Sequence, residues 1–145
     1  MSVEQVAREF ISSMKDPAMM QTMVAPGAMA SGGALPMPMP LVESMKVTDV
    51  MMAAFPDMTI DVRDVQVKGN DATVKVQLTG TQTGLFSLPF PRMQSIPATG
   101  KKVSVPDAFV VTVDGDKVSG MRVDSPANGG MPAILSQLGV KMPGM

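Results

Sequence analysis

The sequence predicts an α+β fold in which a curved antiparallel or mixed β-sheet wraps around N-terminal helices. Three observations favour this fold class. Apolar residues in the first third of the chain recur with a helical period, and from Thr59 onward the period changes to two. Helices that precede a block of strands are typical of α+β proteins. Breaks in the strand alternation indicate a curved sheet. A chain of 145 residues can bury one core, so we expect residues 1–145 to form a single domain.

Two helices are expected at the N-terminus. Ser2 and Gln5 have the spacing of a capping box, and the apolar stripe that follows predicts an amphipathic helix at 3–14. Asp16-Pro17 combines an N-cap residue with proline at the first helical position. This pair predicts a second, short helix that runs to about Val24.

A third helix is predicted at 41–54, and Phe55-Pro56-Asp57 should end it. Residues 25–40 are rich in alanine, glycine and proline, which is typical of a loop. Because this segment is apolar, we expect it to pack over the mouth of a cavity and not to act as a solvated linker.

Strands are expected from Thr59. The alternation changes phase near Arg63-Asp64, which predicts a bulge that curves the first strand. Residues 69–71 form a hairpin turn, and residues 72–79 alternate between apolar and polar as in a half-buried antiparallel strand.

The connection from Gly80 to Gly100 combines several prolines with large apolar side chains. Proline prevents regular strand pairing, and the apolar side chains are costly to leave in water. Residues 84–97 are therefore expected either to act as a lid or subunit contact, or simply to fold back onto the core.

The last third of the chain predicts two more strands and a helix. A strand at 101–113 is interrupted by Pro106, which indicates a bulge or an edge position. The turn at 114–116 leads into a strand at about 117–124. A closing helix is expected at 132–138, with Gly139 as its stop signal.

Composition excludes several classes of function. The chain has no His, Cys, Trp or Tyr, which removes Ser-His-Asp triads, cysteine nucleophiles and His-ligated zinc. Acid–base chemistry must therefore come from ten Asp, three Glu or the lysines. Twelve basic and thirteen acidic residues, without a basic cluster, give no sign of nucleic-acid binding. No apolar run is long enough to span a membrane, and the N-terminus lacks the layout of a signal peptide, so a cytoplasmic protein is expected.

The chain contains 17 methionines, for which three interpretations stand. Thioethers can line an adaptable apolar pocket, and they can serve as ordinary core filler. Soft sulfur ligands such as Met37 and Met39, or Met19, Met20 and Met23, could also bind Cu(I). We expect a pocket for a small hydrophobic ligand, with neither cofactor nor resident metal. Its candidate lining residues are Phe10, Met14, Met52, Phe55, Phe86, Phe90 and Phe109.

One carboxylate near the end of the last strand is a candidate catalytic group. Strand alternation puts Gly120, Arg122 and Asp124 on one face and Met121 and Val123 on the other. If the first face lines the cavity, burial raises the pKa of Asp124 while Arg122 lowers it. Such a carboxylate could take a proton from a carbon next to a carbonyl. The alternative is a solvated Arg122–Asp124 pair at the sheet edge.

Several motifs resemble the SnoaL-like polyketide cyclases. These are FPDMTI at 55–60, LTGTQTG at 78–84, IPATGK at 96–101, DGDKV at 114–118 and LSQLG at 135–139. The resemblance implies the cone-shaped α+β fold of the nuclear transport factor 2-like superfamily. It also implies a homodimer formed through the outer sheet face. Family members cyclise or isomerise small molecules with an acidic residue, and Asp124 matches its position.

Two further hypotheses accompany this resemblance. Arg122-Val-Asp124 is similar to the Arg-x-Asp of limonene epoxide hydrolase-like enzymes, with Asp107 or Asp61 as the second carboxylate. The lack of His and Tyr favours another alternative, a non-catalytic ligand-binding or interaction module on the same fold.

Overall fold

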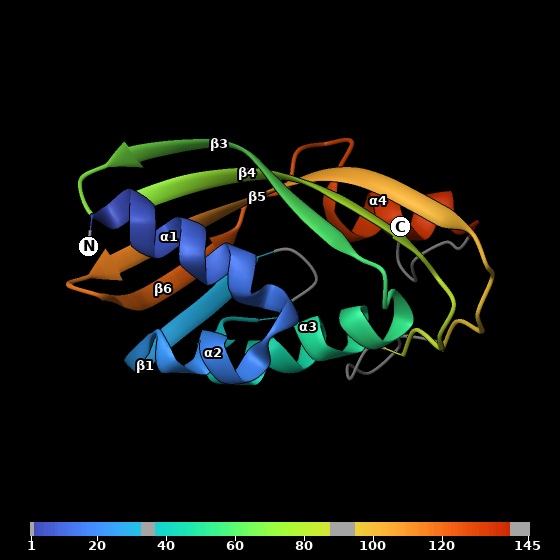
Figure 1. The fold of residues 1–145 in the computed structure, drawn as a ribbon, viewed down its shortest axis with the longest axis horizontal. Helices are drawn as coiled ribbons and strands as arrows, with labels where there is room; N and C mark the ends of the chain where they lie inside the picture. The colour runs from blue at the N-terminus through green and yellow to red at the C-terminus, as the bar shows by residue number, and fades with distance from the viewer. Residues whose placement is uncertain (1, 33–36, 88–94, 140–145) are drawn as a thin grey trace.

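The protein is an α+β structure whose six-stranded mixed sheet curves around its helices (Figure 1). The computed structural model describes residues 2–32, 37–87 and 95–139. The strands lie in the order β2-β1-β6-β5-β4-β3, and the predicted fold class is confirmed. The elements in chain order are α1 (Val3–Ser12), a 3₁₀ turn (Ser13–Lys15), α2 (Pro17–Thr22), β1 (Val24–Gly32), β2 (Met39–Pro40), α3 (Leu41–Ala54), β3 (Thr59–Lys68), β4 (Asp71–Thr81), β5 (Lys102–Asp114), β6 (Lys117–Val123) and α4 (Gly130–Gln137).

Helix α1 forms as predicted and buries one face against the sheet. The Ser2 hydroxyl accepts from the Gln5 amide at 3.2 Å, and the Gln5 side chain accepts from the Ser2 amide at 3.0 Å. This reciprocal cap satisfies backbone donors that the first helical turn leaves free. Phe10 and Ile11 are fully buried and belong to the same core as Val74 and Phe109 of the sheet. Helix α1 is therefore held by its apolar face.

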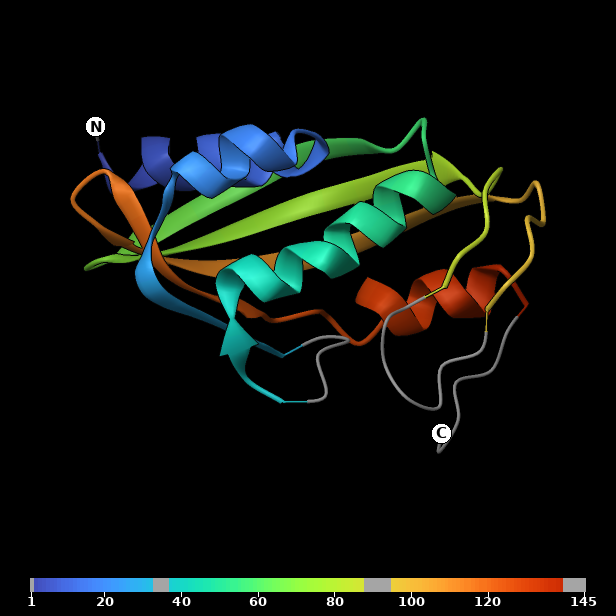
Figure 2. The same cartoon turned by 90° about the horizontal axis from the view of Figure 1, so that it is seen from below.

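The other two N-terminal helices also follow the prediction. The Asp16 carboxylate accepts from the Met19 amide at 3.3 Å and caps α2. Helix α3 covers 41–54 and ends before Phe55, whose side chain is fully buried. In the view of Figure 2, α3 runs across the concave side of the sheet.

The expectation that residues 25–40 form a loop is wrong in part. Residues 24–32 form β1, which pairs in parallel with β6, and residues 39–40 pair with β1 as β2. No residue pattern announces β1, because its buried side chains are only Ala28 and Ala30. Pairing with β6 stabilises this strand, and local propensity does not predict such a long-range contact.

Two β-bulges curve the sheet, and one of them lies where the sequence predicts it. The β3–β4 register shifts between Val62 and Asp64, so the predicted bulge is confirmed. A second shift lies in the β5–β6 pair between Thr112 and Val113. Because an extra residue increases the local twist, these bulges bend the sheet around the helices.

Pro106 occupies an edge position, which is one of the two expected alternatives. The β4–β5 register passes through Pro106 without a shift, whereas β6 pairs only with residues 109–114 of β5. Helix α4, which begins two residues earlier than predicted, lies against the free part of this edge. There the Gln137 amide donates to the Ser104 carbonyl at 3.0 Å and accepts from the Ser104 amide at 2.9 Å. A side-chain amide thus takes the place of a strand partner.

The connection after β4 is organised by a buried amide. Gln82 is fully buried and donates to the carbonyls of Gly84, Ile96 and Pro97, while its oxygen accepts from the Thr99 hydroxyl at 2.7 Å. The Phe86 and Ile96 backbones also pair with each other. Among the described residues of this connection, Phe86 and Ile96 pack into the core, whereas Leu85 is exposed.

None of the helices among the described residues has the length and apolar character needed to cross a membrane.

Candidate functional site

A pocket of about 100 Å³ lies between α3 and the concave face of the sheet. Its lining combines methionines with other apolar groups and three hydroxyls. The lining residues are Met14, Gly32, Ser44, Val47, Thr48, Met51, Met52, Met58, Leu78, Phe109, Met121, Val123 and Ser125.

The pocket is uncharged and adaptable in shape. Five of its lining side chains are methionines, whose unbranched thioethers fit irregular ligands and make favourable contacts with aromatic rings. The lining contains no Asp, Glu, Lys or Arg among the described residues. Of its hydroxyls, Ser44 donates to the Leu41 carbonyl at 2.7 Å within α3. The walls therefore favour an apolar molecule with few polar atoms.

The predicted lining residues divide into three groups. Met14, Met52 and Phe109 line the pocket. Phe10, Phe55 and Phe86 are instead part of the packed core, and the rings of Phe55 and Phe86 meet edge to face with centroids 5.7 Å apart. Phe90 lies outside the described residues.

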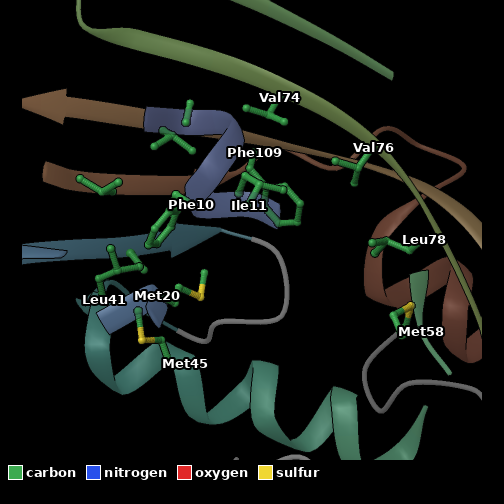
Figure 3. Packing of buried hydrophobic residues seen from close by; sticks show 14 of the residues in the cluster. Phe10, Ile11, Met20, Leu41, Met45, Met58, Val74, Val76, Leu78 and Phe109 are labelled. Atoms are coloured by element: carbon green, nitrogen blue, oxygen red, sulfur yellow. The ribbon is translucent and has the colours of Figure 1, made fainter. Parts of the chain in front are cut away.

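Figure 3 shows the packing of the buried core from close by. Phe10 and Ile11 extend from α1 toward the sheet, while Met58 and Leu78, which line the pocket, lie together toward the other end. Phe10 is fully buried in the core, whereas Phe109 lines the pocket. Sequence periodicity identified these phenylalanines as buried but could not separate core from cavity wall.

The structure places Arg122 and Asp124 away from the pocket. The predicted strand alternation holds in β6, but the pocket is lined by Met121 and Val123, which belong to the opposite face. Arg122 and Asp124 are both exposed. The expectation that their face lines the hollow is wrong, because the β5–β6 register pairs Met121 with Val111 and Val123 with Phe109 on the core side.

A different carboxylate, Asp107 of β5, is buried beside the pocket. It is 8% exposed, and its Oδ1 accepts from the Ala108 amide at 2.8 Å and from the Ser125 hydroxyl at 2.7 Å. Burial raises the pKa of the Asp107 carboxyl, while these two hydrogen bonds lower it by a smaller amount. Because Ser125 lines the pocket, it connects this carboxylate with the cavity.

Sequence reasoning gave Asp107 only a secondary role, as a possible partner in an epoxide hydrolase-like set. The available signal was its parity, since Asp107 shares a strand face with the buried residues Val105 and Phe109. The interruption at Pro106 hid this alternation.

The epoxide hydrolase-like set is not brought together. Asp61 is exposed and forms an ion pair with Arg63 at 3.1 Å, whereas Asp107 is buried and Asp124 faces solvent. The described residues also contain no group of three or more carboxylates that could hold a metal ion. Of the methionines considered for copper, Met20 is buried, whereas Met19 and Met37 are exposed.

A second hollow, of about 310 Å³, lies at the edge of the sheet around the start of β1. It is lined by Gln21, by residues 24–29, and by Pro40 and Val42. Its lining contains no hydroxyl among the described residues, whereas the first pocket has three, one of which is hydrogen-bonded to Asp107.

Comparison with known proteins defines the class. The family model for the SnoaL-like domain matches residues 7–121, so the chain belongs to the SnoaL-like family, as the motifs predicted. Among curated proteins, no sequence matches the chain.

Solved structures share the fold over nearly the whole chain. A candidate SnoaL-like polyketide cyclase from Jannaschia sp. CCS1 is 21% identical with a TM-score of 0.75, covering 96% of this chain and 92% of that one. IdmH, a candidate polyketide cyclase from Streptomyces antibioticus, is 20% identical with a TM-score of 0.72 and coverages of 97% and 100%. AclR, a candidate hydroxylase from Streptomyces galilaeus, is 16% identical with a TM-score of 0.76 and coverages of 99% and 83%. These similarities confirm the nuclear transport factor 2-like fold.

Proposed function

We propose that this protein binds a small hydrophobic molecule in the methionine-lined pocket. The observation that carries the proposal is a concave site with apolar walls and a few hydroxyls, which is the usual character of ligand sites. The family relationship supports it, because similar structures are described as candidate polyketide cyclases.

The pocket size limits the ligand to about one ring. Sites for drug-sized ligands measure roughly 300–1,000 Å³, whereas an apolar cavity of about 150 Å³ takes up benzene. A pocket of about 100 Å³ therefore suits a single-ring molecule, with methionine side chains shifting to admit it.

Binding without catalysis is the form of this function that the lining favours. A ligand inside the pocket touches methionine, valine and hydroxyl side chains, none of which titrates near neutral pH. This neutral lining supports the ligand-binding module proposed as the alternative to an enzyme.

Blocking the pocket tests the proposal. Toluene should raise the melting temperature of the wild-type protein, since a ligand at 100 times its Kd stabilises the folded state by about 2.7 kcal/mol. Val123→Trp fills the pocket from β6 and should abolish this increase. Val67→Trp, on the exposed part of β3, is the matched control and should retain it. An increase that survives in Val123→Trp would place the toluene elsewhere.

Proton transfer is a second candidate function, and one observation favours it. Asp107 is a buried carboxylate joined to the pocket through Ser125. If the protein moves protons on a bound ketone, deuterium exchange at the α-carbon of cyclopentanone should be faster with the protein than without it. Asp107→Asn should then remove the acceleration and Asp124→Asn should retain it. The reverse order would restore Asp124 as the proton carrier.

A further inference from the structure

At the polar end of the pocket, one hydroxyl is held by a buried carboxylate. Ser125 lines the pocket, and its Oγ donates to Asp107 Oδ1 at 2.7 Å. A hydroxyl has one hydrogen and two lone pairs. Since its hydrogen is directed to Asp107, Ser125 can offer only lone pairs to a ligand.

The packing around this pair holds it in one arrangement. The Ala108 amide also donates to Asp107 Oδ1, at 2.8 Å, and so positions the carboxylate. A Cβ added to Gly130 would lie 2.3 Å from the Ser125 hydroxyl oxygen, so glycine is required for Ser125 to lie this close to the start of α4. The Ala108 amide thus positions the carboxylate that the hydroxyl faces, and Gly130 leaves room for the hydroxyl.

We propose that Ser125, positioned by Asp107, is the hydrogen-bond acceptor of the pocket and selects single-ring ligands that carry a hydroxyl donor, such as phenols. This inference rests on the proposed binding function and deepens it. A phenol would place its ring among the methionines and donate its O–H to Ser125 Oγ. A methyl ether offers no hydrogen, and its oxygen would face a lone pair of Ser125. The preference arises because a ligand without a donor leaves the Ser125 oxygen without a hydrogen bond from the ligand, which costs free energy.

The charge of Asp107 strengthens the selection. Hydrogen bonds to an ionised partner are roughly twice as strong as neutral ones, and a hydroxyl that donates to a carboxylate becomes a better acceptor. Burial raises the pKa of Asp107, so protonation weakens the selection as the pH falls through that value.

The surroundings of Asp107 contribute no competing charge among the described residues. Val76 of β4 lies opposite it, and α4 and its preceding connection contain one titratable residue, the exposed Asp124. No charged side chain is among the causes of its pKa shift.

The experiment compares the Kd values of phenol, toluene and anisole for the wild-type protein and three variants by NMR titration. Toluene matches phenol in size, and anisole keeps the oxygen without its hydrogen. In Ser125→Ala the ratio of the toluene Kd to the phenol Kd should fall about tenfold, because phenol loses one hydrogen bond. Asp107→Leu should shift it in the same direction, since Ser125 loses its fixed orientation.

Asp107→Asn separates orientation from charge. Its side-chain oxygen can still accept from Ala108 and Ser125, so the phenol preference should remain but lose its dependence on pH between 8 and 4. This variant and Ser125→Ala also keep the test valid if Asp107→Leu does not fold.

The outcomes distinguish the two proposals. If all three probes bind and Ser125→Ala leaves their relative affinities unchanged, the inference is wrong while the binding function stands. If none of the probes shifts the resonances of pocket residues, the binding function itself fails. A pH-independent preference in the wild-type protein would contradict the part assigned to Asp107.

Discussion

Two carboxylates illustrate how the surroundings of a single residue change its effect on stability. Asp107 is buried, and burial raises its pKa above the ordinary value of 3.8. Asp57 is exposed, and the hydrogen bond from the Thr81 amide, at 2.7 Å, lowers its pKa below the same value. The two residues should therefore respond to pH in opposite directions.

For Asp107, we expect Asn to be stabilising at neutral pH. A carboxyl with a raised pKa contributes fully to the stability of the folded state below pH 3.8, and this contribution is lost as the pH rises through the folded-state pKa. Asp107→Asn should thus melt at a higher temperature than wild type at pH 7, with the two curves converging near pH 4. Thermal unfolding followed by circular dichroism across this range measures the difference. A gap that widens toward low pH would contradict the assigned shift.

For Asp57, the expected sign is opposite. A carboxylate with a lowered pKa stabilises the folded state above pH 3.8, and this contribution is lost as the pH falls through the folded-state pKa. Asp57→Asn should be less stable than wild type at pH 7, and the difference should disappear in acid. Equal stability of the two proteins at pH 7 would show that the Thr81 hydrogen bond does not depend on charge.

At the residue scale, the sequence predicted which side chains alternate but not which face is internal. The alternation of Arg122 and Asp124 with Met121 and Val123 was predicted correctly, yet the buried face is the second one. Burial depends on the register with β5, and a seven-residue strand with mixed polarity on both faces leaves that choice open.

At the scale of elements, one buried amide determines how the connection after β4 packs. Gln82 bonds to three carbonyls and to Thr99, all within the connection. Gln82→Leu would leave these buried partners unsatisfied, so we expect a loss of roughly 2–4 kcal/mol in the free energy of unfolding. Urea unfolding measures this loss, and Gln66→Leu on the exposed part of β3 is the control. A loss no larger than that of the control would rule out this role.

The position of α4 depends on close approach at Gly129. A Cβ there would lie 2.0 Å from the Pro106 carbonyl oxygen, so the backbone must move to admit one. We expect Gly129→Ala to destabilise the protein by about 2–3 kcal/mol in urea unfolding. Gly120→Ala is the control, because its Cβ would make only ordinary contacts, the nearest at 3.6 Å. Similar stability of the two variants would contradict the packing described for α4.

Elements with a local signal were predictable, and those held by distant partners were not. The capped helix α1 and the alternating strand β4 carry their signals within a few residues. Strand β1 carries no such local signal, because this segment of small side chains forms a strand only when β6 lies beside it. Asp107 is a different case, because its parity with Val105 and Phe109 is a local signal that the interruption at Pro106 obscures.

At the scale of the whole molecule, the fold alone leaves the chemistry open. Similar structures are described as candidate polyketide cyclases and as a candidate hydroxylase, at identities of 16–21%. Function in such folds depends on the particular side chains around the cavity. Here they are five methionines, a neutral lining and one serine held by Asp107.

Ligand binding in the methionine-lined pocket is most directly tested by NMR of the protein with ¹³C-labelled methionine methyl groups, titrated with toluene. We expect the resonances of Met51, Met52 and Met121 to shift in a saturable manner, while those of the exposed Met19 and Met29 stay unchanged. Shifts confined to exposed methionines, or none at all, would contradict this expectation.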